Sequence, residues 1–413
     1  MSSVFIPSIM ELPVEVLYCI LDRLDTKDIL FSFRNVCRHF HAITDNYNQY
    51  KVRVTCTSPK ADIHRLCRII RPQNIASCII VRTTSSADNI DDRIQSFLSL
   101  IDMRQFTRLR SLEIFDTNKV DSNAILGHIS YIPTLMLLKW KNEGWMAEET
   151  IDLLSSIIAT SNLRKLHLHC INPQVYTRIP IPNQCKLENL TVDICDHRQL
   201  CNILRYLPNL RAFSSSYYLM EGMDQIDFST SFQQLTSLSL RSPHMLIDQV
   251  ESLLSVTPSL VNLHIVNYSA TFNFLQRISQ WEKFISRKLP LLQKFKFYTY
   301  SSGYDYRKAS DIDVIMRAFR TSSWLENKCG YVTCQYLNND TRRGIMLYSS
   351  TDSSTDFPNN LEPAILSYST STTKSDSRID GSSMWNIRLN LLEMDNAISS
   401  NEVCTHINLL GFF

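Results

Sequence analysis

The stretch LRKLHL, residues 163–168, decides the fold because close copies of it return throughout the middle of the chain. Each copy follows the pattern L-x-x-L-x-L or a near variant. The copies begin at Leu109, Leu135, Leu163, Leu187, Leu210, Leu235, Leu260 and Leu292. Their successive spacings are 26, 28, 24, 23, 25, 25 and 32 residues, and IASCII at Ile75 is a weaker copy upstream. A repeat of this period predicts a stack of similar supersecondary units.

The segments between the copies have the apolar spacing of amphipathic helices, and the longest explains the 32-residue gap. These predicted helices are 91–103, 148–160, 197–207, 248–256 and 273–289. Four prolines are predicted to follow a helix and to precede a strand by one or two residues, where a helix cannot continue. They are Pro133, Pro208, Pro258 and Pro290.

Units of helix, proline and strand resemble leucine-rich repeats. The resemblance predicts a curved α/β solenoid over residues 60–300, with a parallel sheet on its concave face. The solenoid is expected to be irregular. Such repeats usually have Asn or Cys three residues after the last apolar position, and only Cys195 stands there, while Ser215 replaces an apolar residue. A plain mixed α/β domain is the alternative.

Alternation along the strands predicts a row of outward side chains across the concave face. The row is Glu113, Lys139, His167, Thr191, Ser214, Ser239, His264 and Lys296. Flanking rows are expected to hold Lys165, Asn189, His169, Asp193 and Arg241. A curved surface of mixed polar groups suits protein recognition, although an ordinary solvated face would have the same residues.

The N-terminal stretch LPVEVLYCILDRLDTKDILFSFRNVCRHFHAI, residues 12–43, predicts three short helices. Pro13 suits the first turn of a helix, and Asp25 or Thr26 suits the cap of the second. Val16, Leu17, Ile20, Leu21 and Leu24 form one apolar stripe. Three short helices cannot bury all their apolar groups among themselves. The excess of apolar surface predicts a partner interface.

This stretch resembles an F-box, which we place at residues 8–52. The resemblance carries the Leu-Pro-x-Glu opening and the Val-Cys-Arg-x-Phe close. It implies that the segment binds a Skp-type adaptor and, through it, the cullin of a ubiquitin ligase. The positions carried over for adaptor binding are Leu12, Pro13, Glu15, Val16, Ile20, Leu24, Val36 and Cys37. The family often has a Trp after this close, where the chain offers Phe40, Tyr47 and Tyr50. In F-box proteins with such repeats, the concave face typically holds the substrate.

Three other readings of the helices and repeats stay open. The N-terminal helices could merely cap a repeat scaffold that has no ligase role. A helix-turn-helix DNA reader is disfavoured, because residues 11–50 hold four Lys and Arg against six Asp and Glu. A hydrolase within the irregular solenoid would need a cleft that sequence cannot show.

Composition and motifs give no indication that the chain catalyses a reaction. No phosphate-binding loop, nucleophile elbow or dinucleotide fingerprint is present, so we expect neither enzyme activity nor a cofactor. In HLHC, residues 167–170, His167 and His169 share one side of a strand while Cys170 points away, so we expect no metal. A net charge of +2 provides no strong electrostatic attraction for nucleic acid or for a membrane surface. Without a signal peptide or membrane span, the chain is expected in the cytoplasm or nucleus, with its 12 cysteines reduced.

The last hundred residues depart from the repeat. Residues 301–348 are predicted to form a β-rich cap, with two strands joined by a turn at 338–340 after a short helix. Residues 349–383 are rich in Ser, Thr and Asp, which predicts a flexible segment with one short strand. Residues 384–413 are apolar again and are expected to return to the core.

Overall fold

The structure is a computed structural model that folds as two compact units. It describes residues 9–82, 91–117, 119–129, 131–142, 148–160, 162–170, 185–219, 231–242, 245–267, 277–302, 317, 319, 331–338, 343–350, 366–369 and 388–389. The first unit comprises Met1–Cys195 and Gln199–Ser214, and the second comprises Asp196–Arg198 and Ser215–Phe413. The strand β7 (Ala212–Leu219) and the helix α9 (His197–Tyr206) contain residues of both units.

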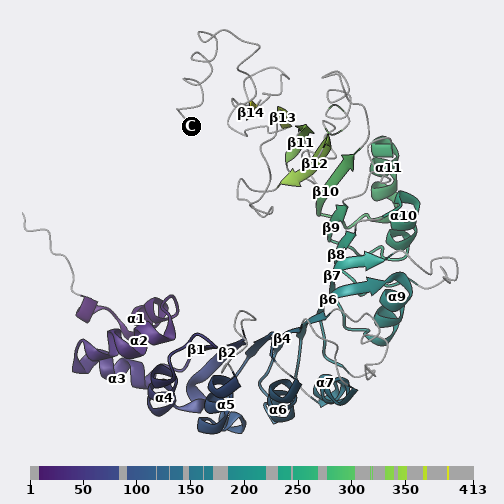
Figure 1. Cartoon of the computed structure of the whole chain (residues 1–413). Coiled ribbons are helices and arrows are strands. Elements are labelled where there is room, and N and C mark those ends of the chain that lie inside the picture. Colours follow the sequence, from purple (N-terminus) through teal and green to yellow (C-terminus); the bar gives the residue numbers. More distant parts are fainter. Residues whose placement is uncertain are drawn as a thin grey trace, which may run out of the picture. The chain divides into compact units, whose positions relative to one another are not determined.

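The first unit opens with short helices and continues as a parallel sheet covered by helices (Figure 1). The opening elements are η1 (Ile9–Glu11), α1 (Val14–Leu21), α2 (Thr26–Phe31), η2 (Phe33–Asn35) and α3 (Arg38–Asn46). The strands are β1 (Tyr50–Thr55), β2 (Ile75–Val81), β3 (Ser111–Phe115), β4 (Leu137–Asn142), β5 (Lys165–Cys170) and β6 (Asn189–Asp196). Each strand pairs in parallel with the next. The helices between them are α4 (Lys60–Ile69), α5 (Asp91–Leu100), α6 (Lys119–Ile129) and α7 (Glu148–Thr160), with the short turns η3 (Pro72–Asn74) and η4 (Met103–Gln105).

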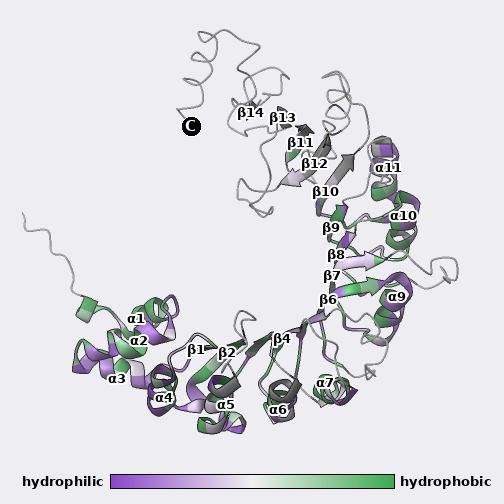
Figure 2. Ribbon diagram, in the orientation of Figure 1, coloured by the Kyte–Doolittle hydropathy of each residue, from purple (hydrophilic) through white to green (hydrophobic). Residues whose placement is uncertain are grey.

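The second unit continues with parallel strands and ends with antiparallel ones. Its parallel strands are β8 (Ser237–Ser242), β9 (Asn262–Asn267) and β10 (Lys294–Ser302), with the helices α10 (Ile247–Ser255) and α11 (Ile278–Lys288). Strand β12 (Arg343–Ser350) pairs antiparallel with both β10 and β11 (Tyr331–Asn338). The short strands β13 (Leu366–Ser369) and β14 (Arg388–Leu389) follow. Figure 2 shows hydrophobic residues recurring along α10, whose Ile247, Val250, Leu253 and Leu254 are buried.

The leucine pattern fixes where each strand starts. In all eight copies the strand begins two residues after the leading leucine, for example at Lys165 after Leu163. The second leucines stand in register, as Leu112, Leu138, Leu166 and Leu190 show, and all four are buried. The alternate side chains leave the sheet on the face opposite the helices. The sheet core is therefore built from one face of each strand.

A common turn leads into these strands. The N–H of the leading leucine donates to the carbonyl three residues earlier, as in Leu135 to Ile132 (3.3 Å), Leu210 to Leu207 (3.1 Å) and Leu292 to Leu289 (3.1 Å). This turn makes the connection longer than we predicted. The strands begin four residues after Pro133, Pro208, Pro258 and Pro290, not one or two.

Other differences from the sequence analysis concern the ends of the sheet. The sheet starts at Tyr50 in β1, before the predicted start at residue 60, and α6 was not predicted. The two strands predicted in the cap correspond to β11 and β12. The preceding helix is outside the described residues except at 317 and 319, and so is most of the turn that joins the strands. Of the predicted flexible segment, only Ser349, Ser350 and β13 are described, and of the C-terminal segment only β14. The described fold is α/β, with N-terminal helices and a parallel sheet.

Candidate functional site

The N-terminal helices pack around a small core of their own. Leu17 and Leu21 of α1 are buried, and they share this core with Ile29 and Leu30 of α2 and Phe40 of α3. Asp25 caps α2 by accepting a hydrogen bond from the N–H of Lys27 (2.8 Å). Cys37 caps α3 through its sulfur, which accepts from the N–H of Phe40 (3.5 Å). The polar caps and the apolar spacing together fix where α2 and α3 begin.

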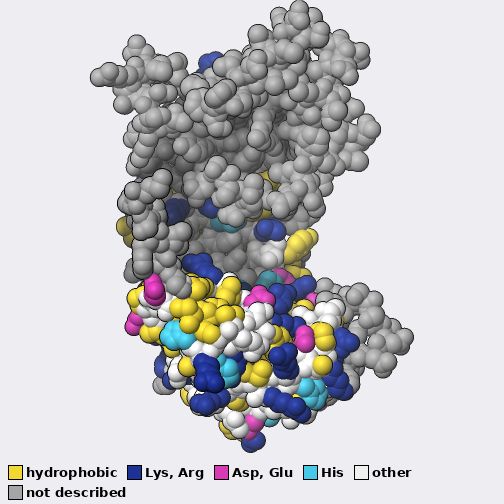
Figure 3. Space-filling model, turned by 90° about the vertical axis from the view of Figure 1, so that its left-hand side faces the viewer, with side chains coloured by type: hydrophobic (Ala, Val, Ile, Leu, Met, Phe, Trp, Pro, Cys, Tyr) yellow, Lys and Arg dark blue, Asp and Glu magenta, His cyan; other side chains and the backbone are white. Residues whose placement is uncertain are grey.

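A second set of apolar residues on these helices is exposed. We name it the apolar N-terminal surface, and it consists of Ile9 (45% exposed), Met10 (43%), Val14 (40%), Val16 (42%), Leu24 (36%) and Val36 (67%). Figure 3, which faces this end of the molecule, shows hydrophobic side chains gathered among Lys and Arg side chains. An exposed apolar patch with a charged rim marks a protein interface more often than a solvated face.

The structure divides the residues that we predicted for adaptor binding. Pro13, Glu15, Val16, Leu24 and Val36 are exposed, while Leu12, Ile20 and Cys37 are half-buried.

The single stripe predicted on α1 was wrong in one respect. Leu17 and Leu21 face the core, while Val16 faces outward because one residue turns a helix by about 100°. Leu24 lies beyond the end of α1 at Leu21 and is exposed. Ile9, Met10 and Val14 belong to the apolar N-terminal surface and were missed. Their apolarity ahead of the first helical turn was the available signal.

Hydrogen bonds join the N-terminal helices to the first strand. The Thr26 hydroxyl donates to the carbonyl of Lys51 (2.8 Å) and accepts from its N–H (3.1 Å). The Tyr50 hydroxyl donates to the carbonyl of Thr44 (2.7 Å), and the Tyr47 hydroxyl donates to Asp22 (2.7 Å). Burial, and then the Asp22 carboxylate, raise the pKa of Tyr47, so this hydroxyl keeps its proton. The helices therefore dock directly on β1.

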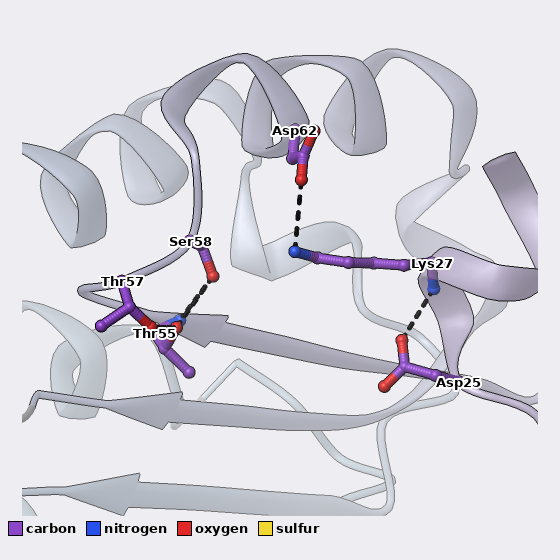
Figure 4. Close-up of polar contacts among 6 residues, drawn as sticks. All are labelled: Asp25, Lys27, Thr55, Thr57, Ser58 and Asp62. Carbon is purple, nitrogen blue, oxygen red and sulfur yellow. Dashed lines mark hydrogen bonds and ion pairs between the residues drawn. The ribbon is translucent and has the colours of Figure 1, made fainter.

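Charged contacts extend this junction to α4 (Figure 4). Lys27 of α2 forms an ion pair with Asp62 of α4 at 3.3 Å. The Arg65 guanidinium of α4 lies 4.5 Å from the centre of the Phe31 ring of α2. Between β1 and α4, the Ser58 hydroxyl accepts from the N–H of Thr55 (3.2 Å). Side chains of α2, β1 and α4 thus hold the first strand and its following helix against the N-terminal helices.

The predicted outward row of the first unit stands in register across four strands. Glu113 pairs with Lys139, Lys139 with His167, and His167 with Thr191. The register extends the row to Ile79 and Arg53 on β2 and β1, which we had not predicted. We name the side of β1–β6 that the described helices leave uncovered the open sheet face. Its flanking rows include the predicted Lys165, Asn189, His169 and Asp193.

The second unit places its part of the predicted row in the same way. Ser239 pairs with His264, and His264 with Lys296, and all three are half-buried. The Ser239 hydroxyl lies 3.2 Å from Nδ1 of His264. Arg241 is exposed on β8. Ser214, which belongs to the first unit, is half-buried on β7. This row is therefore polar, and neighbouring side chains partly shield it from solvent.

Electrostatic pairing is dense on the open sheet face. The Lys139 ammonium lies 3.0 Å from the Glu113 carboxylate, and Nδ1 of His169 lies 2.6 Å from the Asp193 carboxylate. Burial lowers the pKa of His167, and the neighbouring charge of Lys139 lowers it further. A neutral His167 can donate one hydrogen bond and accept another. The face offers hydrogen-bond donors and charge, and its residues suit binding.

Within the ranges that the structure describes, no three His, Cys, Asp or Glu side chains gather as a metal site would require. No described helix is both long and apolar enough to span a bilayer.

Comparison with protein families identifies the N-terminal helices. Residues 9–51 match the model of the F-box domain. The match covers α1, α2, α3 and the start of β1, so residues 9–51 are identified as an F-box domain. F-box domains bind Skp-type adaptors, and the domain implies a role in adaptor binding for a Skp–cullin–F-box ubiquitin ligase. A comparison with curated proteins found no match to the chain.

Proposed function

We propose that the chain is the substrate-recognition subunit of a cullin-based ubiquitin ligase. In this proposal the apolar N-terminal surface binds the Skp-type adaptor, the adaptor links the chain to a cullin, and the sheet holds a protein substrate. The chain itself forms and breaks no bonds. It raises the effective concentration of the substrate near the ubiquitin-charged enzyme, and the substrate is then degraded. Such a role places the chain inside the cell, in the cytoplasm or nucleus.

The observation that carries the proposal is the exposure of Val16 and Val36 within the F-box match. Leu17 and Leu21 are the buried residues of α1, and hydrogen bonds of Thr26 and Tyr50 join the N-terminal helices to β1. Neither task uses Val16 or Val36. A helical cap alone would have no need for this surface, whereas an adaptor gains free energy by covering it.

We also propose that the strands and helices after the F-box form an irregular leucine-rich-repeat-like solenoid. Support comes from the fixed offset between each leading leucine and its strand, and from the parallel register of the second leucines. The substrate site would lie on the sheet side that the helices leave uncovered.

Capture of the full chain by a purified Skp-type adaptor tests the ligase role. The full chain is needed because the F-box is hydrogen-bonded to β1 through Thr26 and Lys51. The double change Val16→Asp and Val36→Asp is expected to abolish capture and to leave the circular dichroism spectrum unchanged. The matched change Met136→Asp and Tyr131→Asp alters two exposed apolar residues outside the F-box and should leave capture intact.

A repeat scaffold capped by these helices is the competing function, and the contacts of Thr26 with Lys51 favour a capping role as well. The two roles separate in the same experiment. If the wild-type chain is folded and the adaptor does not capture it, the ligase proposal is wrong and the scaffold stands.

A further inference from the structure

The open sheet face has an uneven distribution of charge and apolar surface. Its first strand, β1, presents Lys51 and Arg53, and both side chains are exposed. At the other end, β4 and β5 present Lys139, Lys141 and Lys165. Two cations therefore stand on one side of the face and three on the other.

Between these cations lies a small apolar area. Ile79 and Val81 of β2 and Phe115 of β3 all leave the sheet on this side and are half-buried. Arg53 is paired in register with Ile79, and Phe115 with Lys141, so the apolar area directly adjoins both groups of cations. Apolar side chains held partly in water on an open face gain free energy when a partner covers them.

The carboxylates on this face already lie beside basic side chains. Glu113 lies 3.0 Å from Lys139, and Asp193 lies 2.6 Å from His169. At the edge of the face, Asp116 lies 3.9 Å from Lys141. Arg53 and Lys165 have no ion-pair partner among the described residues. The face thus keeps a surplus of positive charge although the whole chain has a net charge of only +2.

His167 gives a second indication of this surplus. It stands between Lys139 and Thr191 in register, with Lys165 and His169 on its own strand and Glu113 one strand further. Burial, Lys139 and His169 lower its pKa, and Lys165 adds to the effect, against a smaller rise from Glu113. The cations around His167 therefore outweigh the single acid, and an incoming carboxylate would relieve their repulsion.

We propose that the open sheet face binds an extended segment of the substrate that has acidic residues at both ends and apolar residues between them. This inference rests on the proposed substrate-recognition role and adds the chemical class of the substrate. Strands lie about 4.8 Å apart, so β1 is about 14 Å from β4 and about 19 Å from β5. An extended chain advances about 3.3 Å per residue. The two acidic ends therefore lie about four to six residues apart, with the apolar side chains over Ile79, Val81 and Phe115.

Fluorescence anisotropy of labelled peptides with the full chain tests this proposal. The probe is a peptide of about ten residues in which two Asp residues stand about five positions apart, with Leu and Phe between them. A second peptide has Lys in place of Asp, and a third has Ser in place of Leu and Phe. We expect the first peptide to bind, the Lys peptide to show no binding, and the Ser peptide to bind at least about tenfold more weakly. Equal binding of the Asp and Lys peptides, or of the Asp and Ser peptides, would overturn the proposal.

Variants locate the binding on the face. The double change Arg53→Glu and Lys165→Glu is expected to weaken binding of the Asp peptide at least about tenfold. Arg68→Glu and Arg108→Glu make the same change of net charge at exposed positions outside the strands and should leave binding within about twofold. If both double variants weaken binding equally, only general charge attraction is present and the inference fails.

Capture by the Skp-type adaptor, measured on the same preparations, separates the two proposals. A chain that the adaptor captures but that binds none of the peptides contradicts the acidic-segment proposal and leaves the ligase role intact. A chain that binds the Asp peptide but is not captured contradicts the ligase role, and the open sheet face then serves a scaffold.

Discussion

Thr26 and Lys51 exchange two hydrogen bonds through a single hydroxyl group. The Thr26 hydroxyl donates to the Lys51 carbonyl at 2.8 Å and accepts from the Lys51 N–H at 3.1 Å. Thr26 begins α2 and Lys51 lies in β1, so one side chain completes the main-chain hydrogen bonding of an edge strand. Thr26 is buried, which makes an unpaired group at this position costly. The F-box and the sheet of the first unit are therefore joined at an edge that would otherwise be open.

We expect Thr26→Val to destabilise this junction by about 1–3 kcal/mol, because the valine preserves the shape and leaves two part-buried main-chain groups of Lys51 without these hydrogen bonds. Hydrogen exchange of the α2 and β1 amides measures the loss. Thr26→Ser is the matched control, since it keeps the hydroxyl and removes one methyl group, at a cost of about 0.8 kcal/mol. A larger loss for Ser than for Val would show that packing, and not hydrogen bonding, holds the junction.

The ion pair between Lys27 and Asp62 is expected to contribute much less. Its side chains are 37% and 38% exposed, and the two atoms are 3.3 Å apart. Exposed pairs of this kind contribute about 0.2–1 kcal/mol, and salt weakens them. A double-mutant cycle of Lys27→Ala and Asp62→Ala measures the coupling free energy at low and high salt. A coupling above about 2 kcal/mol would mean that this pair is shielded from water and dominates the docking of α4.

The sequence predicted the sheet well because its signal is local. The second leucine of each copy predicts which residue of the strand is buried, and Leu112, Leu138 and Leu166 are indeed buried. Strand β1 was missed although Val52 and Val54 alternate with polar residues, because no leading leucine precedes it. Tyr50, which lies within the segment 8–52 that we compared with the F-box, begins β1.

The F-box illustrates what local patterns cannot decide. Val16 and Leu17 are adjacent and equally apolar, yet one is exposed and the other is buried. Their difference depends on where α2 and α3 pack against α1, which is a tertiary property. The exposed positions Ile9 and Met10 had no helical periodicity to reveal them. The residues predicted for adaptor binding came from family resemblance, whereas the division between buried core and exposed surface required coordinates.

Leucine-rich repeats usually have a linking Asn or Cys after the strand, whereas in this chain two linking asparagines lie before the strand. Asn162 and Asn209 each precede a leading leucine. Their side-chain amides donate to main-chain carbonyls of the previous copy, at Pro133 (2.9 Å) and Cys185 (3.0 Å). Thr134 occupies the same place and donates to Leu109 (2.9 Å). The turn that precedes each strand is thus the position where side chains link the copies.

We expect Asn209→Ala to lower the free energy of unfolding by about 1 kcal/mol, the usual contribution of one hydrogen bond. Asn209→Asp should cost more, because a carboxylate would face the Cys185 carbonyl that now accepts a hydrogen bond. Urea denaturation followed by circular dichroism measures both. Gln233→Ala, at an exposed turn residue, is the control and should change the stability by less than about 0.5 kcal/mol. Equal effects at the two positions would remove the role assigned to Asn209.

Because His197 is buried, we expect the stability of the folded chain to depend on pH. The side chain is fully buried at the start of α9, and Nδ1 lies 2.7 Å from the Tyr218 hydroxyl, which is also buried. Burial lowers the pKa of His197 to about 4, with Asp196 opposing the shift. The ordinary histidine pKa is about 6.5, so between these values the unfolded chain binds a proton that the folded chain does not.

The stability that a neutral His197 contributes is therefore complete above about pH 6.5 and is lost as the pH falls toward 4, by up to about 1.4 kcal/mol per pH unit. We expect His197→Gln to lower the stability at pH 7, since its packing with Tyr218 changes, and to flatten the slope between pH 4.5 and 6.5. Urea denaturation at several pH values measures the slope. His39→Gln, at an exposed position of α3, should keep the slope of the unmodified chain. An unchanged slope in His197→Gln would mean that other groups cause the acid sensitivity and that His197 binds its proton equally in both states.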